Sequence, residues 1–124
     1  MSGVGVEQLV WNPGDTEVRW LSGAAWVRKA YPEQIQSVVV LADGSGVAVV
    51  EHVAEIGSRS AVVFDADGSE RFRLPGELDG RPVWYFQMYY VQGVLTVFFG
   101  WRAGDWSSPV DESSGQLLAV RESR

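Results

Sequence analysis

The chain has 124 residues, no cysteine, and a net charge of −6 that comes from 16 acidic and 10 basic residues. We expect residues 1–124 to form a single domain, because this length buries a core without disulfides. The missing cysteines favour a reducing, cytoplasmic compartment and exclude metal sites built on thiolates. Because the bases are scattered, the chain lacks the basic face that nucleic-acid binding needs, so we expect no nucleic-acid partner.

We also expect no membrane association. Residues 1–7 contain neither a basic segment nor an apolar run, so they do not predict a signal peptide. The longest nearly uncharged stretch, residues 82–101, is long enough to span a bilayer. Polar residues and glycines interrupt it, however, and they predict a hairpin rather than a membrane helix.

The first thirty residues leave two structures open. Residues 9–11 predict a short strand that ends in the turn residues 12–15. Residues 16–31 fit either a short helix capped by Thr16 or a pair of strands. We favour strands here, since Gly23 would lie inside the helix at a cost of about 1 kcal/mol relative to alanine.

The rest of the chain predicts hairpins. Residues 38–51 and 61–74 each contain a β-branched or aromatic run, an Asp-Gly turn and a second run, which is a strong local hairpin signal. Residues 83–99 and 109–120 repeat this pattern more loosely around single glycines. We therefore predict an all-β antiparallel meander of hairpins. Propeller-like, sandwich and open-barrel arrangements all remain open.

The predicted hairpin at residues 83–99 is apolar on both faces. A strand with one wet face alternates polar and apolar residues, and this hairpin does not alternate. It therefore lies at the centre of the sheet system, or a partner covers one of its faces. A second copy of the chain is one candidate for that partner, so a homo-oligomer is possible.

Motifs for catalysis, cofactors and metals are missing. Residues 65–70 contain two acidic positions of a calcium loop, but the helix and the distant glutamate of that loop do not follow, so we interpret them as a turn. His52 is the sole histidine and has no nucleophile motif to serve. We therefore expect no enzyme activity, no cofactor and no catalytic or metal-binding residue.

Six tryptophans are many for this length, and we expect most of them in the core. Trp106 differs because residues 100–109 are rich in glycine, serine and aspartate and look like a loop. An exposed tryptophan beside acids and arginine is typical of an interface hot spot or of a sugar-stacking platform. Our candidate partner-binding residues are Asp105, Trp106, Asp111 and Glu112.

Three motifs occur in succession: the hairpin at residues 62–68, the glycine-centred hairpin at 92–97, and the ending at 110–117. Together they resemble small all-β bacterial immunity proteins of polymorphic toxins, including those of contact-dependent growth inhibition systems. The resemblance covers roughly residues 35–121. It implies a cytoplasmic protein that binds one toxin domain and blocks it, with no catalytic residues to carry over.

These observations lead to one functional hypothesis and one alternative. The chain is a non-catalytic protein-binding module, an immunity protein that neutralises a toxin domain. Its acidic charge suits a basic toxin, since opposite fields favour association. The alternative is a β domain that binds a carbohydrate or small ligand through exposed aromatic side chains.

Overall fold

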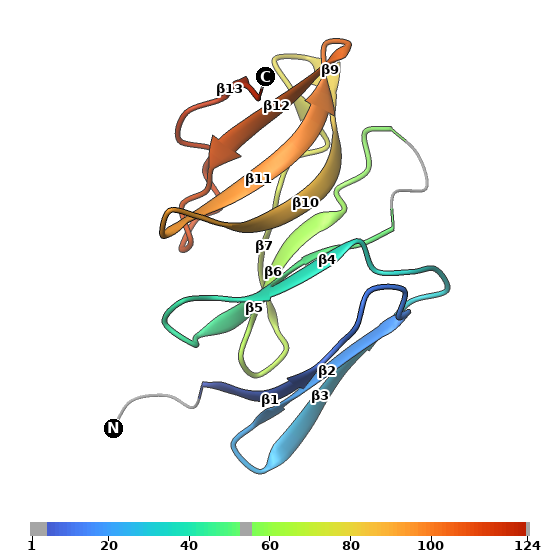
Figure 1. The fold of residues 1–124 in the computed structure, drawn as a ribbon, viewed down its shortest axis with the longest axis vertical. Helices are drawn as coiled ribbons and strands as arrows, with labels where there is room; N and C mark the ends of the chain where they lie inside the picture. Colours follow the sequence, from blue (N-terminus) through green and yellow to red (C-terminus); the bar gives the residue numbers. More distant parts are fainter. Residues whose placement is uncertain (1–4, 53–55, 124) are drawn as a thin grey trace.

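The computed structural model describes residues 5–52 and 56–123. In this part of the chain there are thirteen strands, arranged in four antiparallel sheets, and no helix (Figure 1). Within these described residues, no sheet closes into a barrel. The prediction of an all-β meander is therefore confirmed.

The first sheet has three strands in the order β1-β2-β3. They are β1 (Val6–Val10), β2 (Glu17–Ser22) and β3 (Ala25–Ala30). The favoured strands within residues 16–31 are thus confirmed, and the helix alternative is wrong. Gly23 lies in the β2–β3 turn with φ +63°, a conformation that glycine adopts without steric cost.

Two larger sheets of four strands each follow along the chain. The second sheet contains β4 (Ser37–Val40), β5 (Gly46–Val50), β6 (Ala61–Asp65) and β7 (Glu70–Arg73). The third contains β10 (Trp84–Val91), β11 (Val94–Trp101), β12 (Gly104–Pro109) and β13 (Arg121–Glu122). A small ribbon of β8 (Glu77–Leu78) and β9 (Arg81–Pro82) links them.

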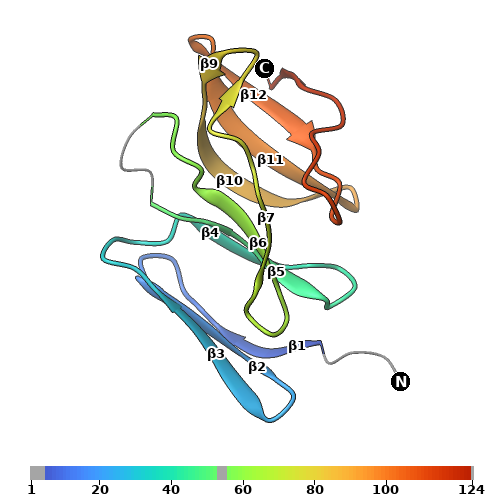
Figure 2. The same ribbon diagram turned by 180° about the vertical axis from the view of Figure 1, so that it is seen from behind.

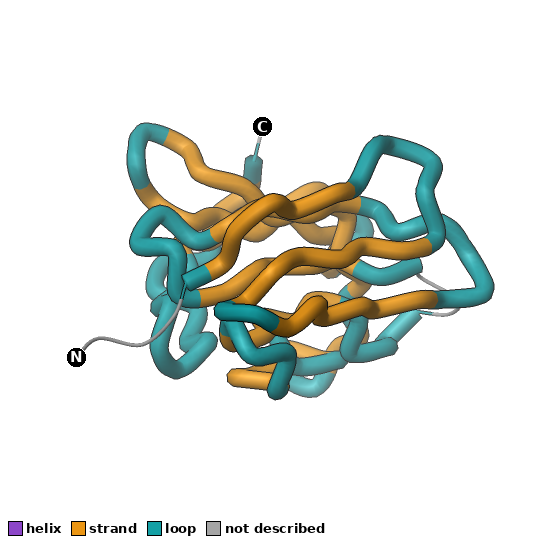
Figure 3. The backbone as a smooth tube through the Cα atoms, turned by 90° about the horizontal axis from the view of Figure 1, so that it is seen from below, coloured by secondary structure: helices purple, strands orange, loops and turns teal. Residues whose placement is uncertain are grey.

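The sheets stack in chain order, with the second sheet in the middle (Figure 1). One core lies between the first and second sheets and includes Val18, Trp20, Val47, Val49 and Phe64. The other lies between the second and third sheets and includes Ala48, Val50, Val63, Met88 and Phe99. Figure 3 shows that the loops gather at the two ends of the strands.

Because both faces of the second sheet are covered, all five residues of β5 are buried. Successive side chains of a strand point to opposite faces, so Val47 and Val49 pack on the first sheet while Ala48 and Val50 pack toward the third. A strand that is buried on both faces has a continuous apolar sequence. The centre of the structure is therefore this strand and its neighbour β6.

The predicted hairpin at residues 83–99 is real, since β10 pairs with β11 from Trp84 to Val91. It belongs to the third sheet, however, which is an outer layer rather than the centre (Figure 1). One of its faces packs on the second core, through Tyr85 and Met88 among others. Its apolar opposite face is left outside.

Of two expectations for the C-terminal part, one is wrong and the other holds in part. The loop predicted at residues 100–109 is the β11–β12 hairpin, whose turn uses Arg102 and Ala103 at φ +52° and +59°. Because neither turn residue is glycine, asparagine or aspartate, the usual hairpin signal is absent. The hairpin predicted at residues 109–120 does turn back, with backbone hydrogen bonds from Leu118 to Pro109 and from Asp111 to Gln116, but its ladder is limited to one bridge, between Val110 and Leu117. After this turn the chain returns beside the third sheet to its edge strand β13 (Figure 2), and Val110 and Leu117 pack with the second core.

Candidate functional site

The four residues predicted to bind a partner lie at opposite ends of β12. Asp105 and Trp106 are near its start, and Asp111 and Glu112 follow its end. At about 3.3 Å per residue, the strand separates the two pairs by roughly 17 Å. They are thus two places on one sheet rather than one cluster.

The side chain of Trp106 packs inward. Its ring is nearly perpendicular to that of Trp101, with 4.9 Å between the ring centroids, and it contacts the core under the third sheet. Its indole Nε1 is buried and has no hydrogen-bond partner among the described residues. This geometry explains Trp106 as a core residue, and its contact with a partner stays a prediction.

Asp111 and Glu112 both hold local structure. The Oδ1 atom of Asp111 accepts hydrogen bonds from the backbone amides of Ser113 and Ser114, at 2.8 and 3.0 Å. These bonds favour the carboxylate and lower the pKa of Asp111. The carboxylate of Glu112 accepts the Tyr90 hydroxyl at 2.8 Å. Both side chains are half-buried, so each keeps a surface that a partner can reach.

The outer side of β10 and β11 is the second apolar face of the hairpin at residues 83–99, which the sequence indicated but which is not among the four candidate residues. We call it the aromatic face, and it consists of Trp84, Phe86, Tyr89 and Phe98. The rings of Tyr89 and Phe98 stack with 4.9 Å between centroids, and those of Trp84 and Phe86 meet edge to face at 5.9 Å. None of the four packs against either core, and Tyr89 is 41% exposed.

Gly100 on β11 makes room for one end of this face. A Cβ atom there would lie 2.4 Å from the ring of Trp84, so the ring rests directly on the strand backbone. Gly100 also pairs with Asp105 across the β11–β12 ladder. Trp84, Gly100 and Asp105 therefore form one row across the sheet, and the exposed carboxylate of Asp105 borders the aromatic face.

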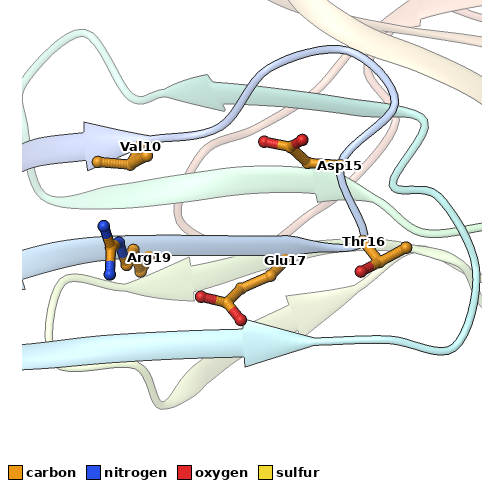
Figure 4. Close-up of a pocket in the computed structure, with 5 residues that line it drawn as sticks. All are labelled: Val10, Asp15, Thr16, Glu17 and Arg19. Carbon is orange, nitrogen blue, oxygen red and sulfur yellow. The ribbon is translucent and has the colours of Figure 1, made fainter.

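The outer side of the first sheet offers a second, more polar surface. Trp26 on β3 is 52% exposed, and the guanidinium of Arg19 lies 5.5 Å from the centroid of its ring. Nearby, the Arg28 guanidinium forms an ion pair with Glu17 at 2.7 Å. An open pocket of about 380 Å³ lies on this side, lined by Val10, Asp15, Thr16, Glu17 and Arg19 (Figure 4).

The structure brings no catalytic set together in the described residues. His52 is exposed just after β5. Its neighbour Glu51 is occupied by an ion pair with Arg73 at 2.8 Å and by the Tyr31 hydroxyl at 2.7 Å. Burial, together with that hydrogen bond to Glu51, raises the pKa of Tyr31 and keeps its phenol neutral.

Metal ligands are not gathered either. Across residues 5–52 and 56–123, no group of three or more acidic or histidine side chains is placed to hold an ion. The fragment resembling a calcium loop is the β6–β7 turn, where Asp65 pairs with Arg71 and Asp67 binds Ser69. In the same described part, no helix has the length and apolarity of a membrane span.

No family model matches this sequence, and no curated protein sequence matches it either. Its structure is similar to a chain of a solved structure, that of Tne2 in complex with Tni2, with a TM-score of 0.76. The match covers 92% of this chain and 82% of the other, at 17% sequence identity. The stacked-meander fold is therefore shared with a member of a two-protein complex.

Proposed function

We propose that the chain is a non-catalytic protein-binding module, an immunity protein that binds and neutralises a basic toxin domain in the bacterial cytoplasm. The observation that carries the proposal is the aromatic face, four aromatic side chains outside both cores. Tyr89 is exposed and the other three rings are half-buried. An apolar patch that reaches the surface of a small protein is typical of an interaction site. The shared fold supports it, since the similar chain comes from a complex of Tne2 with Tni2.

The charge of the molecule supports a basic partner. The chain carries six more acidic than basic residues. Complementary charge speeds association and rejects wrong partners. A toxin domain that acts on an acidic substrate would be basic, and an acidic inhibitor would meet it with opposite charge.

The test has two steps. The tagged chain is incubated in lysate of its source organism, and the retained proteins are identified by mass spectrometry. The gene of a stoichiometric companion is then expressed in a heterologous host with and without the chain. We expect growth arrest from the companion alone and growth when both are made. A companion that is harmless alone, or toxic in both cases, would contradict the proposal.

A second function, binding of a carbohydrate, is favoured by one observation. Trp26 is half-exposed, and Arg19, which lies over its ring, also lines an open and mostly polar pocket. Indole rings can stack on sugars. Quenching of tryptophan fluorescence by a panel of glycans tests this function. Saturable quenching that disappears in a Trp26→Ala variant would establish it. Unchanged emission over the whole panel would exclude those glycans.

A further inference from the structure

We infer that the free edge of β3 is a second interaction surface, apart from the aromatic face. It receives one extended segment of another protein, with polar side chains toward β7, which pairs with β3 as a fourth strand of the first sheet. This inference goes beyond the proposed function and does not depend on it.

The outer edge of β3 presents backbone groups that no described residue binds. At the open end of the β2–β3 hairpin, the amide of Tyr31 donates to the carbonyl of Thr16 at 2.9 Å. Hydrogen-bonded and non-hydrogen-bonded pairs alternate in an antiparallel ladder, so the N–H and C=O groups of Trp26, Arg28 and Ala30 point away from β2. β3 is the last strand of its sheet, and these groups form no hydrogen bond with a described residue. The edge therefore offers donors and acceptors at the spacing that an added strand binds.

Bulges, prolines and projecting charges commonly protect an edge strand, and β3 lacks all three. The β2–β3 register has no shift, and β3 contains no proline. The Arg28 guanidinium turns back to bind Glu17 on β2 at 2.7 Å. The Lys29 ammonium turns inward and lies 4.4 Å from the centroid of the Phe64 ring. The side chains of β3 thus leave its backbone accessible.

The other sheet edges are shorter, irregular or bonded. β4 and β7 have four residues each, and β8, β9 and β13 have two. β1 carries a register shift, and its Val6 amide donates to the Gly44 carbonyl at 2.8 Å. β10 also carries a shift, and its Met88 amide donates to the Ser37 hydroxyl at 3.2 Å. β3 differs from all of them as a regular edge of six residues.

The second sheet extends one strand beyond β3. β3 lies over β6, because Lys29 rests on the Phe64 ring. It also lies against the β6–β7 turn, where a Cβ atom at Gly68 would be 2.7 Å from Cγ1 of Val27. β7 follows β6 in the sheet order, yet no described residue of β7 belongs to the core between the first and second sheets. A strand added to β3 would therefore lie over β7 and complete this cover.

The side of β7 beneath that place is polar. Arg73 lies opposite Val62, a member of the core between the first and second sheets, so it points to the same side. Its guanidinium forms ion pairs with Glu51 and with Glu70, each at 2.8 Å. Burying these charges under apolar side chains would be costly. The side chains of the added strand that face β7 are therefore polar.

A second copy of the chain does not fit this place. In a second copy β3 lies over its own β6. Antiparallel pairing of the two β3 strands would bring that β6 into the space that β7 already fills. Parallel pairing joins residues that are out of step, so it does not produce the two-fold symmetric dimer typical of homo-oligomers. The segment that fits has no layer of its own beneath it, as in an extended arm or loop.

The test uses the whole isotope-labelled chain and two defined peptides. The first is acetyl-Lys-Thr-Val-Thr-Val-Thr-Lys-amide, and the second has the same side chains but methyl groups on its five central amide nitrogens. NMR follows the amide signals of the chain as each peptide is added. We expect saturable shifts and slower hydrogen exchange at Trp26, Arg28 and Ala30 with the first peptide, and neither with the second, because methylation removes its donors. No saturable shift along β3, or equal shifts with both peptides, would overturn the proposal.

Two variants at one position separate the backbone from the side chain. Arg28→Ala and Arg28→Pro both remove the ion pair with Glu17, but only proline removes the N–H group at the edge. That group does not bond to β2, so an edge strand tolerates proline there. We expect Arg28→Pro to weaken binding of the first peptide about ten-fold and Arg28→Ala to change it less than about two-fold. Equal effects in two variants of native melting behaviour would contradict the assignment, and the methylated peptide tests the same bond if Arg28→Pro does not fold.

The remaining outcomes separate this surface from a second copy and from the proposed function. Slower exchange of the three edge amides as the chain alone is concentrated would show a second copy on β3 and would overturn the proposal. The titration requires no toxin, and the growth test requires no particular edge. Protection of the host without a peptide response at β3 would reject the edge alone, and a peptide response without protection would reject the immunity role alone.

Discussion

At the scale of single residues, Trp20 joins the first sheet to the second. Its side chain is fully buried, and its Nε1 donates a 2.7 Å hydrogen bond to the carbonyl of Ala66 at the end of β6. Its ring also lies against that of Phe64, with 6.4 Å between centroids. One side chain therefore supplies both apolar burial and a polar link between layers.

We predict that Trp20→Phe lowers the free energy of unfolding by about 2–3 kcal/mol, because it leaves the Ala66 carbonyl without its donor and leaves unfilled volume. Urea denaturation measures the change. Trp26→Phe is the matched control, and at an exposed position it should change stability by about 0.5 kcal/mol or less. Similar losses in the two variants would show that Trp20 does not hold the layers together.

Arg71 also links two sheets, near the β4–β5 turn. Its guanidinium binds the Asp65 carboxylate at 2.5 Å, the Ser45 carbonyl at 3.1 Å and the Glu112 carbonyl at 3.1 Å. It thereby ties turns of the second and third sheets to one another. A planar group with several donors can do this, whereas a lysine ammonium cannot match the geometry.

At the scale of elements, three turns depend on an ionised aspartate. Hydrogen bonds from the Ser45 and Ser69 hydroxyls and amides lower the pKa of Asp43 and Asp67, and those from the Ser113 and Ser114 amides lower the pKa of Asp111. A lowered folded pKa means that the contribution to stability is complete above the unfolded pKa. It is lost as the pH falls through the folded value.

We therefore predict that the stability advantage of the native chain over Asp111→Asn is present at neutral pH. It should shrink once the pH falls below about 4, the ordinary pKa of an aspartate. Denaturant midpoints measured at a series of pH values give this difference directly. A difference that stays constant, or that grows on acidification, would mean that the turn does not require the carboxylate.

The strand β11 owes one outer feature to a glycine. Gly100 has the extended backbone of a strand, so its backbone conformation suits alanine as well. The Cβ atom of an alanine at this position, however, would collide with the ring of Trp84. We predict that Gly100→Ala displaces this ring toward water. The fluorescence emission should shift to the red, with little change in circular dichroism. Unchanged emission would show that Trp84 does not rest on this position.

Local patterns predicted the elements better than their arrangement. The Asp-Gly turns at residues 43–44 and 67–68 place β4 to β7 correctly, because such turns act through backbone conformation alone. The β11–β12 hairpin was not predicted, because its turn residues Arg102 and Ala103 are not residues that usually form tight hairpin turns. Which hairpin occupies the middle depends on contacts between distant strands, and runs of apolar residues do not distinguish β5 from β10.

The candidate site shows the same limit. The sequence indicates Asp105 as a partner-binding residue because it is an acid next to a tryptophan. In the structure Asp105 borders the aromatic face. Trp106 was selected for its glycine- and serine-rich neighbours, yet strand alternation turns it toward the core. The sequence does not indicate Trp26, the half-exposed tryptophan. Which side of the sheet its side chain occupies follows only from the pairing of β2 with β3. Orientation follows from register, which the sequence specifies weakly.

At the scale of the whole molecule, the first sheet is a cover for the second. Val47, Val49 and Val62 are fully buried beneath it, and Phe64 is nearly so. The second sheet would expose these side chains to water if the cover were absent. Such a patch on a central sheet with exposed edges favours association with other chains.

We predict that a chain beginning at Gln36 forms oligomers and binds an apolar dye, whereas the full chain does neither at the same concentration. Size-exclusion chromatography with fluorescence of the dye tests this. Restoring the missing sheet as a separate peptide should reduce the dye signal. A truncated chain that stays monomeric and does not bind the dye would show that the first sheet adds little to the fold.

The stacked arrangement has a consequence for how such proteins diverge. Each outer sheet is anchored by side chains that point inward, so most positions pointing outward are not constrained by packing in the two cores. Substitutions at exposed positions usually change stability by about 0.5 kcal/mol or less. A lineage can therefore exchange its outward residues, and with them its partner, while the inward residues preserve the backbone. Two chains of this shape can then retain one fold at 17% identity.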